Sequence, residues 1–127
     1  MSPEDVLTWL RQEASEDHRQ SLARYGIPTA RALGVPMGVM KKKAKAWGYD
    51  HACALALWPD GGYEARTMAA HLADPARLDG PTMESWAADF DNWAICDTCC
   101  YQLFAKAGPR WEKVHLWAQN DAEFVKR

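Results

Sequence analysis

The sequence predicts an all-α protein built from about eight or nine helices. Helix-start and helix-stop residues recur along the whole chain, and they divide it into segments of helical length. No segment alternates apolar and polar residues far enough to indicate a β-strand. The connections between segments are short, which is typical of helices that pack antiparallel to their neighbours. A chain of 127 residues has room for one domain.

The first two helices have clear start and stop signals. Residues 2–14 begin with Ser2, a good helix cap, which is followed by a proline and by acidic residues. Residues 16–26 form a second segment that ends at Gly26, a residue type common at helix C-termini. A connector with two prolines and a glycine, residues 27–36, follows.

The remaining segments also have helical length. Residues 36–48 and 50–62 are closed by a glycine and by a Pro-Asp-Gly turn. In residues 63–75, apolar residues recur at the spacing of one helical stripe, which predicts a buried face. The stripe consists of Ala65, Met68, Ala69 and Leu72. The last expected helices lie within residues 81–90, 91–108, 109–119 and 121–127.

Two packings fit this pattern, a compact bundle or a stack of helical hairpins. The sequence shows no self-similarity at a fixed period, so repeats alone do not decide between them. The last segment, residues 121–127, has no closing Gly, Asn or Pro, and its Phe124 and Val125 need a partner surface. We therefore expect the chain to be cut inside a helix. A stack cut in this way would expose an apolar face through which it could self-associate.

The charges are unevenly distributed. The whole chain has a net charge of −2, yet residues 26–58 carry five cations against Asp50 alone, a local charge of +4. These cations are Arg31, Lys41, Lys42, Lys43 and Lys45. A locally basic segment can bind a polyanion, because the local field matters more than the total charge. The lysines are equally compatible with a solvated helix face.

The N-terminus is acidic and lacks the apolar run of a signal peptide. No stretch approaches the roughly 18 apolar residues of a membrane span. The protein is therefore expected to be cytoplasmic, without membrane contact. Its four cysteines are expected to be free thiols in that compartment.

Residues 89–100, DFDNWAICDTCC, combine three carboxylates, a tryptophan and three cysteines. A metal site is not expected, since Cys99 and Cys100 diverge by about 100° on a helix and the histidines are scattered. A redox site fits less well still, because redox thiol pairs usually lie at the start of a helix that follows a strand. Small thiols packing a helix interface explain the cysteines best, and no cofactor is expected.

Asp91 is the expected N-cap of a helix over residues 92–106. On this helix Trp93 and Asp97 share a face, because they are four residues apart. Cys100 or Tyr101, and then Phe104, extend that face, whereas Ile95, Cys99 and Leu103 are expected in the core. A carboxylate on an otherwise apolar helix needs either an ionic partner or a functional role, and the nearby indole favours a cationic ligand.

Six segments between Ala23 and Arg127 carry a family resemblance through their order and spacing: ARYG, ALGVP, DHACALALW, EARTMAA, WAADFDNWAICD and WAQNDAEFVKR. The most specific piece is the Trp-x-x-x-Asp spacing of Trp93 and Asp97. On these segments the sequence resembles the bacterial DNA alkylation repair glycosylases of the AlkD type.

This resemblance implies HEAT-like helical hairpins stacked into a superhelix whose concave face holds duplex DNA. It implies that Asp97 is catalytic in the release of N3- and N7-alkylated purines and that Trp93 packs against the sugar–phosphate of the damaged nucleotide. Arg127 and Tyr25 would also face the groove. The DNA-binding candidates are therefore Trp93, Arg127 and Tyr25, with Lys41, Lys42, Lys43 and Lys45 from the basic segment. A second groove tryptophan of the family belongs to a later repeat, so residues 1–127 are expected to be the N-terminal part of a longer protein.

The implied reaction suits a single carboxylate. N-alkylation makes the purine a cation and a good leaving group, so the reaction needs no general acid. Asp97 can stabilise the oxocarbenium-like sugar and orient the attacking water. Two alternatives remain: a non-catalytic helical-repeat module that binds DNA or a protein, and a zinc or redox helical domain.

Overall fold

All regular secondary structure in the protein is helical, as predicted. The computed structural model describes residues 1–127. Its α-helices are α1 (Pro3–Glu13), α2 (Glu16–Leu22), α3 (Met37–Trp47), α4 (His51–Leu57), α5 (Tyr63–Leu72), α6 (Gly80–Ala88), α7 (Trp93–Gln102), α8 (Arg110–Trp117) and α9 (Glu123–Lys126). Three short 3-10 helices are η1 (Ala23–Tyr25), η2 (Trp58–Asp60) and η3 (Phe104–Lys106). None of the helices combines the length and the apolar content that crossing a bilayer requires.

Capping groups set the ends of the first helices. Ser2 and Asp5 form a reciprocal capping box at the start of α1, so the predicted cap is confirmed. The second helical segment ends at Gly26, also as predicted, and this glycine has a left-handed backbone with φ of 71°. These ends were predictable because each cap is a local interaction between residues close in the sequence.

Helix α7 begins and ends differently from the prediction. Its N-cap is Asn92, whose Oδ1 accepts the Ile95 N–H at 2.9 Å, whereas Asp91 accepts a bond from the Asn92 side chain. The helix ends at Gln102, because Leu103 has a non-helical backbone with φ of −128° and ψ of −63°. Phe104 is therefore turned into the core, and its predicted place on the Trp93 face is wrong.

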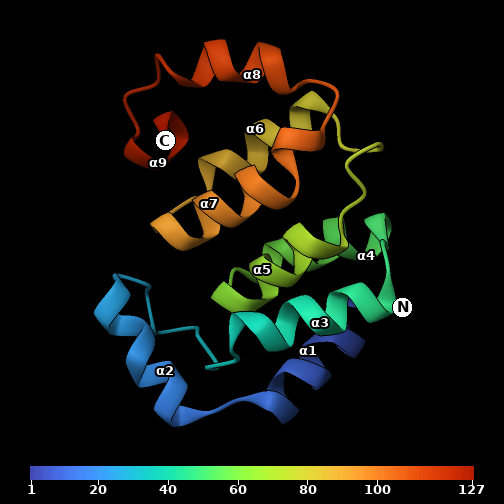
Figure 1. Ribbon diagram of the computed structural model, residues 1–127, viewed down its shortest axis with the longest axis vertical. Coiled ribbons are helices and arrows are strands. Elements are labelled where there is room, and N and C mark those ends of the chain that lie inside the picture. Colours follow the sequence, from blue (N-terminus) through green and yellow to red (C-terminus); the bar gives the residue numbers. More distant parts are fainter.

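The helices are stacked along the long axis of the molecule, and consecutive long helices run in alternate directions (Figure 1). Helix α5 lies centrally and packs against α1, α3, α4 and α7. Helices α8 and α9 form one end of the stack, and α1 and α2 form the other (Figure 1). The protein is thus a stack of helical hairpins, the second of the two packings that the sequence left open.

One continuous hydrophobic core runs through the stack from α1 to α8. The predicted stripe of α5 is buried, and so are Ile95, Cys99 and Leu103 of α7 and its adjoining turn. The indoles of Trp58 and Trp86 stack with their centroids 4.2 Å apart, which joins the end of α4 to α6. Burial of these large side chains is the main source of stability for such a stack.

The C-terminal end of the stack exposes apolar side chains. On α8, Trp111, Val114 and Leu116 are exposed, whereas Phe124 and Val125 of α9 are half-buried. This agrees with the apolar face expected at this end. Self-association through that face stays a prediction.

Candidate nucleic-acid interface

Asp97 on α7 and Arg127, directly after α9, form a two-pronged ion pair. Nε of Arg127 donates to Oδ1 of Asp97 at 2.8 Å, and Nη2 donates to Oδ2 at 2.9 Å. Such bidentate, charge-assisted contacts are both stronger and better oriented than single hydrogen bonds. The hydrogen bond from Arg127 holds the pKa of Asp97 below its usual value, so the carboxylate is ionised at neutral pH.

Trp93 lies one turn before Asp97 on the same helix, as the spacing predicted. Its Nε1 donates a hydrogen bond to the backbone oxygen of Tyr25 in η1. The indole remains 43% exposed and the Tyr25 side chain is exposed as well. This bond fixes the orientation of the indole and joins α7 to η1.

Trp93, Asp97 and Tyr25 all line one groove of about 480 Å³, which we name the Trp93 groove. Its lining residues come from α2 and η1, from α3 and α5, and from α7. Asp97 is the only carboxylate among them. Arg127 does not line this groove; it lies along a neighbouring apolar groove and reaches Asp97 from there.

A second groove of about 690 Å³, which we name the lysine groove, continues from the first. Its charged residues are Lys41, Lys42 and Lys45 of α3 and Lys106 of η3, and no carboxylate lines it. Lys41, His71 and Gln102 line both grooves, so the two form one surface. This surface carries at least four positive charges on a protein whose net charge is −2.

The structure separates two of the predicted cations from this surface. Lys43 lies on the Trp9 and Trp47 side of α3, with its Nζ 4.8 Å from the Trp47 ring centroid and 5.8 Å from that of Trp9. Arg31 lies in another notch with Arg66, described below. Three of the four lysines proposed from the sequence therefore line the lysine groove.

Two groove residues were missed by the sequence reasoning. Lys106 is remote from the basic segment in the sequence, and only the turn after α7 brings it opposite Lys41 and Lys45. His71 is a polar residue on the largely buried helix α5, and one such residue only weakly indicates a functional site. Neither position could be assigned to a groove before the packing of α3, α5 and α7 was known.

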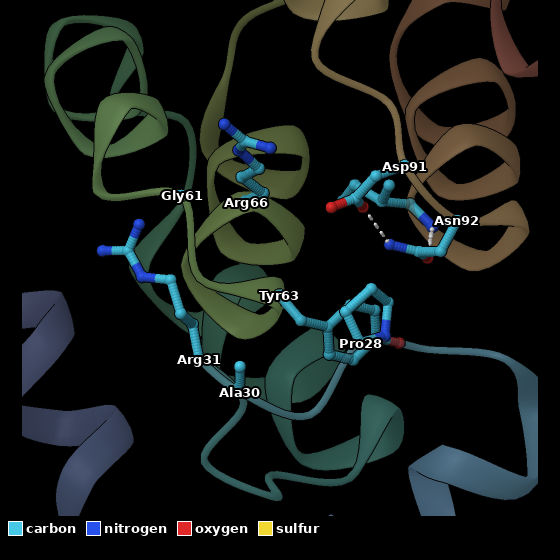
Figure 2. A pocket seen from close by; sticks show the side chains of 9 residues that line it. Pro28, Ala30, Arg31, Gly61, Tyr63, Arg66, Asp91 and Asn92 are labelled. Carbon is cyan, nitrogen blue, oxygen red and sulfur yellow. Dashed lines mark hydrogen bonds between the residues drawn. The ribbon is translucent and has the colours of Figure 1, made fainter.

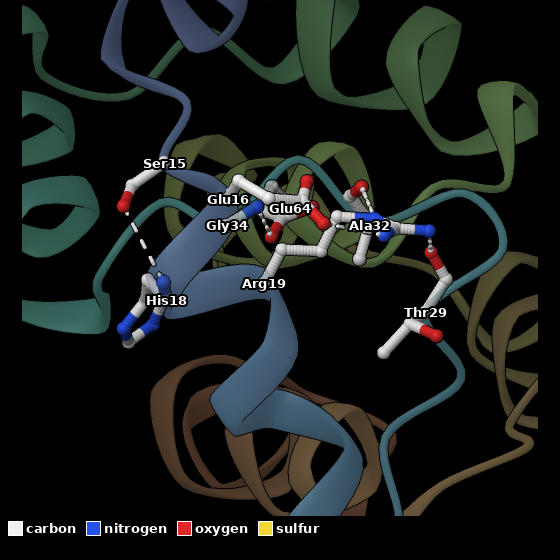
Figure 3. A network of polar contacts seen from close by, with 8 residues as sticks. All are labelled: Ser15, Glu16, His18, Arg19, Thr29, Ala32, Gly34 and Glu64. Carbon is white, nitrogen blue, oxygen red and sulfur yellow. Dashed lines mark hydrogen bonds and ion pairs between the residues drawn. The ribbon is translucent and has the colours of Figure 1, made fainter.

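A buried carboxylate holds the connector between η1 and α3 in place. Glu64 of α5 is 1% exposed and accepts the backbone N–H groups of Leu33 and Gly34 at 2.9 Å each and that of Val35 at 3.4 Å. Arg19 of α2 donates to the backbone oxygens of Ala32 and Thr29 at 3.1 and 2.8 Å (Figure 3). Because the connector joins η1 to α3, these bonds fix two walls of the Trp93 groove. The signal in the sequence was an acidic residue beside the apolar stripe of α5, and it was missed.

Arg31 and Arg66 line a smaller notch of about 220 Å³ near the starts of α5 and α7 (Figure 2). Arg66 is already engaged, since it donates to the backbone oxygens of Trp58 and Asp89 at 3.4 and 3.2 Å. The carboxylate of Asp91 also lines the notch. Arg66 also forms an ion pair with the carboxylate of Asp89 at 3.7 Å, so two carboxylates offset the two arginines, and the lysine groove is the better polyanion surface.

The cysteines of α7 act as packing residues. Cys96 and Cys99 are buried, and Sγ of Cys96 donates to the backbone oxygen of Phe124 at 3.2 Å. Burial raises the pKa of Cys99 well above its usual value, so this thiol is protonated. The contact from Cys96 holds α9, and therefore Arg127, beside α7.

Residues 6–127 match the protein family described as "DNA alkylation repair enzyme". The chain belongs to this family. Among curated proteins, none matches the sequence. One solved structure is similar with a TM-score of 0.84 and 20% sequence identity, and it is described as "A new family of proteins related to the HEAT-like repeat DNA glycosylases with affinity for branched DNA structures".

This similarity confirms the predicted HEAT-like fold. The alignment covers 98% of this chain and 53% of the other, so the chain spans about half the length of the structure it matches. The roles of Trp93, Asp97, Arg127, Tyr25 and the lysines are not settled by this similarity and stay predictions.

Proposed function

We propose that this protein binds duplex DNA along the Trp93 and lysine grooves and hydrolyses the N-glycosidic bond of N3- and N7-alkylated purines. One observation carries the proposal: an ionised carboxylate, Asp97, stands beside an exposed indole, Trp93, in a groove whose continuation is lined by lysines. A glycosylase acting on a cationic purine needs one negative charge near the sugar and positive charge along the phosphates.

The residues suit distinct tasks in that reaction. The alkylated purine leaves as a neutral base without prior protonation, while positive charge develops on the sugar. Asp97 stabilises that charge, and its oxygens retain lone pairs that can accept a bond from the attacking water. Arg127 fixes the carboxylate and keeps it ionised.

Trp93 and the lysines position the DNA. The indole is held by its bond to Tyr25, so it offers a fixed apolar surface to the deoxyribose next to Asp97. Lys41, Lys42 and Lys45 of α3 supply charge that can neutralise phosphates further along the groove. Binding would therefore rely on the backbone of the DNA rather than on the identity of its bases.

A second candidate function is DNA binding without catalysis. Both oxygens of Asp97 already accept bonds from Arg127, which competes with water for the carboxylate. The similar structure is described by its affinity for branched DNA, not by an excision activity. In this case DNA would bind along the lysine groove, and Asp97 would serve only to hold Arg127 in place.

Release of 7-methylguanine from alkylated duplex DNA tests the proposal, with wild type and Asp97→Asn compared at equal folded fraction. The substitution keeps the shape but removes the charge, so the rate should fall about 10²- to 10³-fold. Affinity for undamaged duplex should change little, because the removed charge does not attract phosphate. Equal excision rates would contradict catalysis by Asp97. Binding of duplex or branched DNA without any excision would favour the second candidate.

A further inference from the structure

His71 lies where the Trp93 groove and the lysine groove meet, and it lines both. Its Nδ1 is 2.8 Å from the backbone oxygen of Thr67, one turn earlier on α5. Because a carbonyl oxygen can only accept, Nδ1 must carry the proton. The other ring nitrogen, Nε2, is the only buried side-chain nitrogen or oxygen without a hydrogen-bond partner in the protein. Buried polar atoms are nearly always paired, so this free nitrogen calls for an explanation.

The surroundings of His71 keep its imidazole neutral in the free protein. Burial is the main cause that lowers its pKa below the usual 6.5, and Lys41 of α3 and Lys106 of η3 lower it further. Lys42 and Lys45 line the same surface, and so does His18 of α2. The only carboxylate on that surface is Asp97, which is paired with Arg127.

We propose that His71 is a phosphate-binding residue that takes up a proton when DNA binds, holding one phosphodiester together with Lys41 and Lys106. The inference rests on the proposed binding of DNA to this surface. A phosphate placed between the two lysines removes the repulsion that they exert on an imidazolium. The protonated Nε2 then donates to a phosphate oxygen and gains the partner that it lacks. Nε2 is covered in the free protein, so the groove side chains over it must move when the phosphate binds.

The sign of the pH dependence follows from this linkage. The histidine binds its proton more tightly in the complex than in the free protein, so DNA binding is strengthened as the pH falls. The gain is complete below the lowered pKa of the free protein, and it disappears as the pH rises through the raised pKa of the complex. Phosphodiesters, lysines and tyrosines do not titrate between about pH 5 and 8, so among the residues that line the two grooves only the histidines can produce this change.

The test measures the affinity for an undamaged duplex at pH 5.5, 6.5 and 7.5 at constant ionic strength, using wild type, His71→Gln and His18→Gln. Wild type should bind about threefold to tenfold more tightly at the lowest pH than at the highest, because a tenfold tighter hold on the proton raises the affinity for DNA by at most the same factor. His71→Gln should lose this dependence. His18→Gln, which alters the other groove histidine, should keep it.

Two further measurements use only the wild-type protein, so they remain valid even where a variant misfolds. Calorimetry in two buffers with different ionisation enthalpies should show proton uptake on binding, and an NMR titration should show the His71 pKa rising in the complex. Duplex binding without proton uptake, or a pH dependence lost in His18→Gln instead, would overturn the role of His71 and leave the proposed function standing. No duplex binding at any pH would overturn both.

Discussion

Two opposing influences act on the carboxylate of Asp97. The hydrogen bond from Arg127 lowers its pKa, partial burial raises it by less, and the charge of Arg127 lowers it again. Both side chains are about half exposed, so solvent screens the pair and it contributes little to stability. Its contribution is present above the ordinary aspartate pKa and is lost as the pH falls through the lowered value. The pair matters mainly because it keeps the Asp97 carboxylate ionised and fixes its orientation.

Replacement of Arg127 should remove the interactions that keep the pKa of Asp97 low. In Arg127→Gln, the pKa of Asp97 should rise, because the donated hydrogen bonds and the positive charge are lost while the burial remains. A carboxyl ¹³C NMR titration of Asp97 measures this directly. Lys126→Gln removes a neighbouring charge that has no ion-pair partner, and it should leave the pKa nearly unchanged. Equal titration curves for wild type and Arg127→Gln would show that the ion pair does not persist in solution.

At the scale of single elements, the connector between η1 and α3 depends on one buried acid. Glu64 accepts three consecutive backbone N–H groups, which have no other partner in that turn. Gly34 in the same turn has φ of 82°, and a Cβ there would lie 2.0 Å from the backbone oxygen of Ser15. The connector therefore tolerates neither loss of the acceptor nor a larger residue at Gly34.

Glu64→Gln should destabilise the protein by about 1–3 kcal/mol, because a buried amide group would face backbone donors that need an acceptor. The free energy of unfolding, measured with urea, gives this value. Glu16→Gln is the matched control, since Glu16 pairs with Arg19 at the surface and its loss should cost under about 1 kcal/mol. Equal stability of the two variants would mean that Glu64 does not hold the connector.

The elements were predictable from the sequence where their signals are local. Ser2, Gly26 and the stripe of α5 act within one or two turns, and the structure confirms them. The early end of α7 was not predictable, because the burial of Phe104 against Phe90 and Trp117 bends the chain away from the helix axis. The helical spacing of Trp93 and Asp97 placed them on one face. The positions of Lys106 and His71 in the lysine groove depend on contacts between segments that are distant in the sequence, so they were not predictable.

At the scale of the whole molecule, the positive surface results from the way the stack gathers lysines on one side. Lys41, Lys42 and Lys45 come from α3, and Lys106 joins them from η3, after the end of α7. Lys43, on the same helix α3, rests against two tryptophan rings instead. A net charge of −2 is therefore no obstacle to binding a polyanion at this place.

The salt dependence of duplex binding should report which lysines meet phosphates. Each phosphate contact contributes about −0.9 to the slope of log K against log salt concentration. Lys45→Ala and Lys106→Ala should each make the slope shallower by about that amount. Lys43→Ala provides the control from the same helix and should leave the slope unchanged. A slope that responds equally to all three substitutions would mean that the DNA phosphates do not bind along the lysine groove.

The bond between Trp93 and the backbone of Tyr25 connects residues 68 positions apart in the chain. It joins the two sides of the Trp93 groove directly, while Glu64 and Arg19 fix the connector beneath. The backbone segments that form the walls are consequently held in place before any ligand arrives, and little backbone freedom remains to be lost on association, although the side chains over His71 must move. A groove of fixed width cannot adapt its shape to bound DNA, so on the proposed function the DNA would have to bend or open to fit it. Selection would then depend on how easily a given stretch of DNA deforms, and a weakened or distorted helix would fit more readily than an intact one.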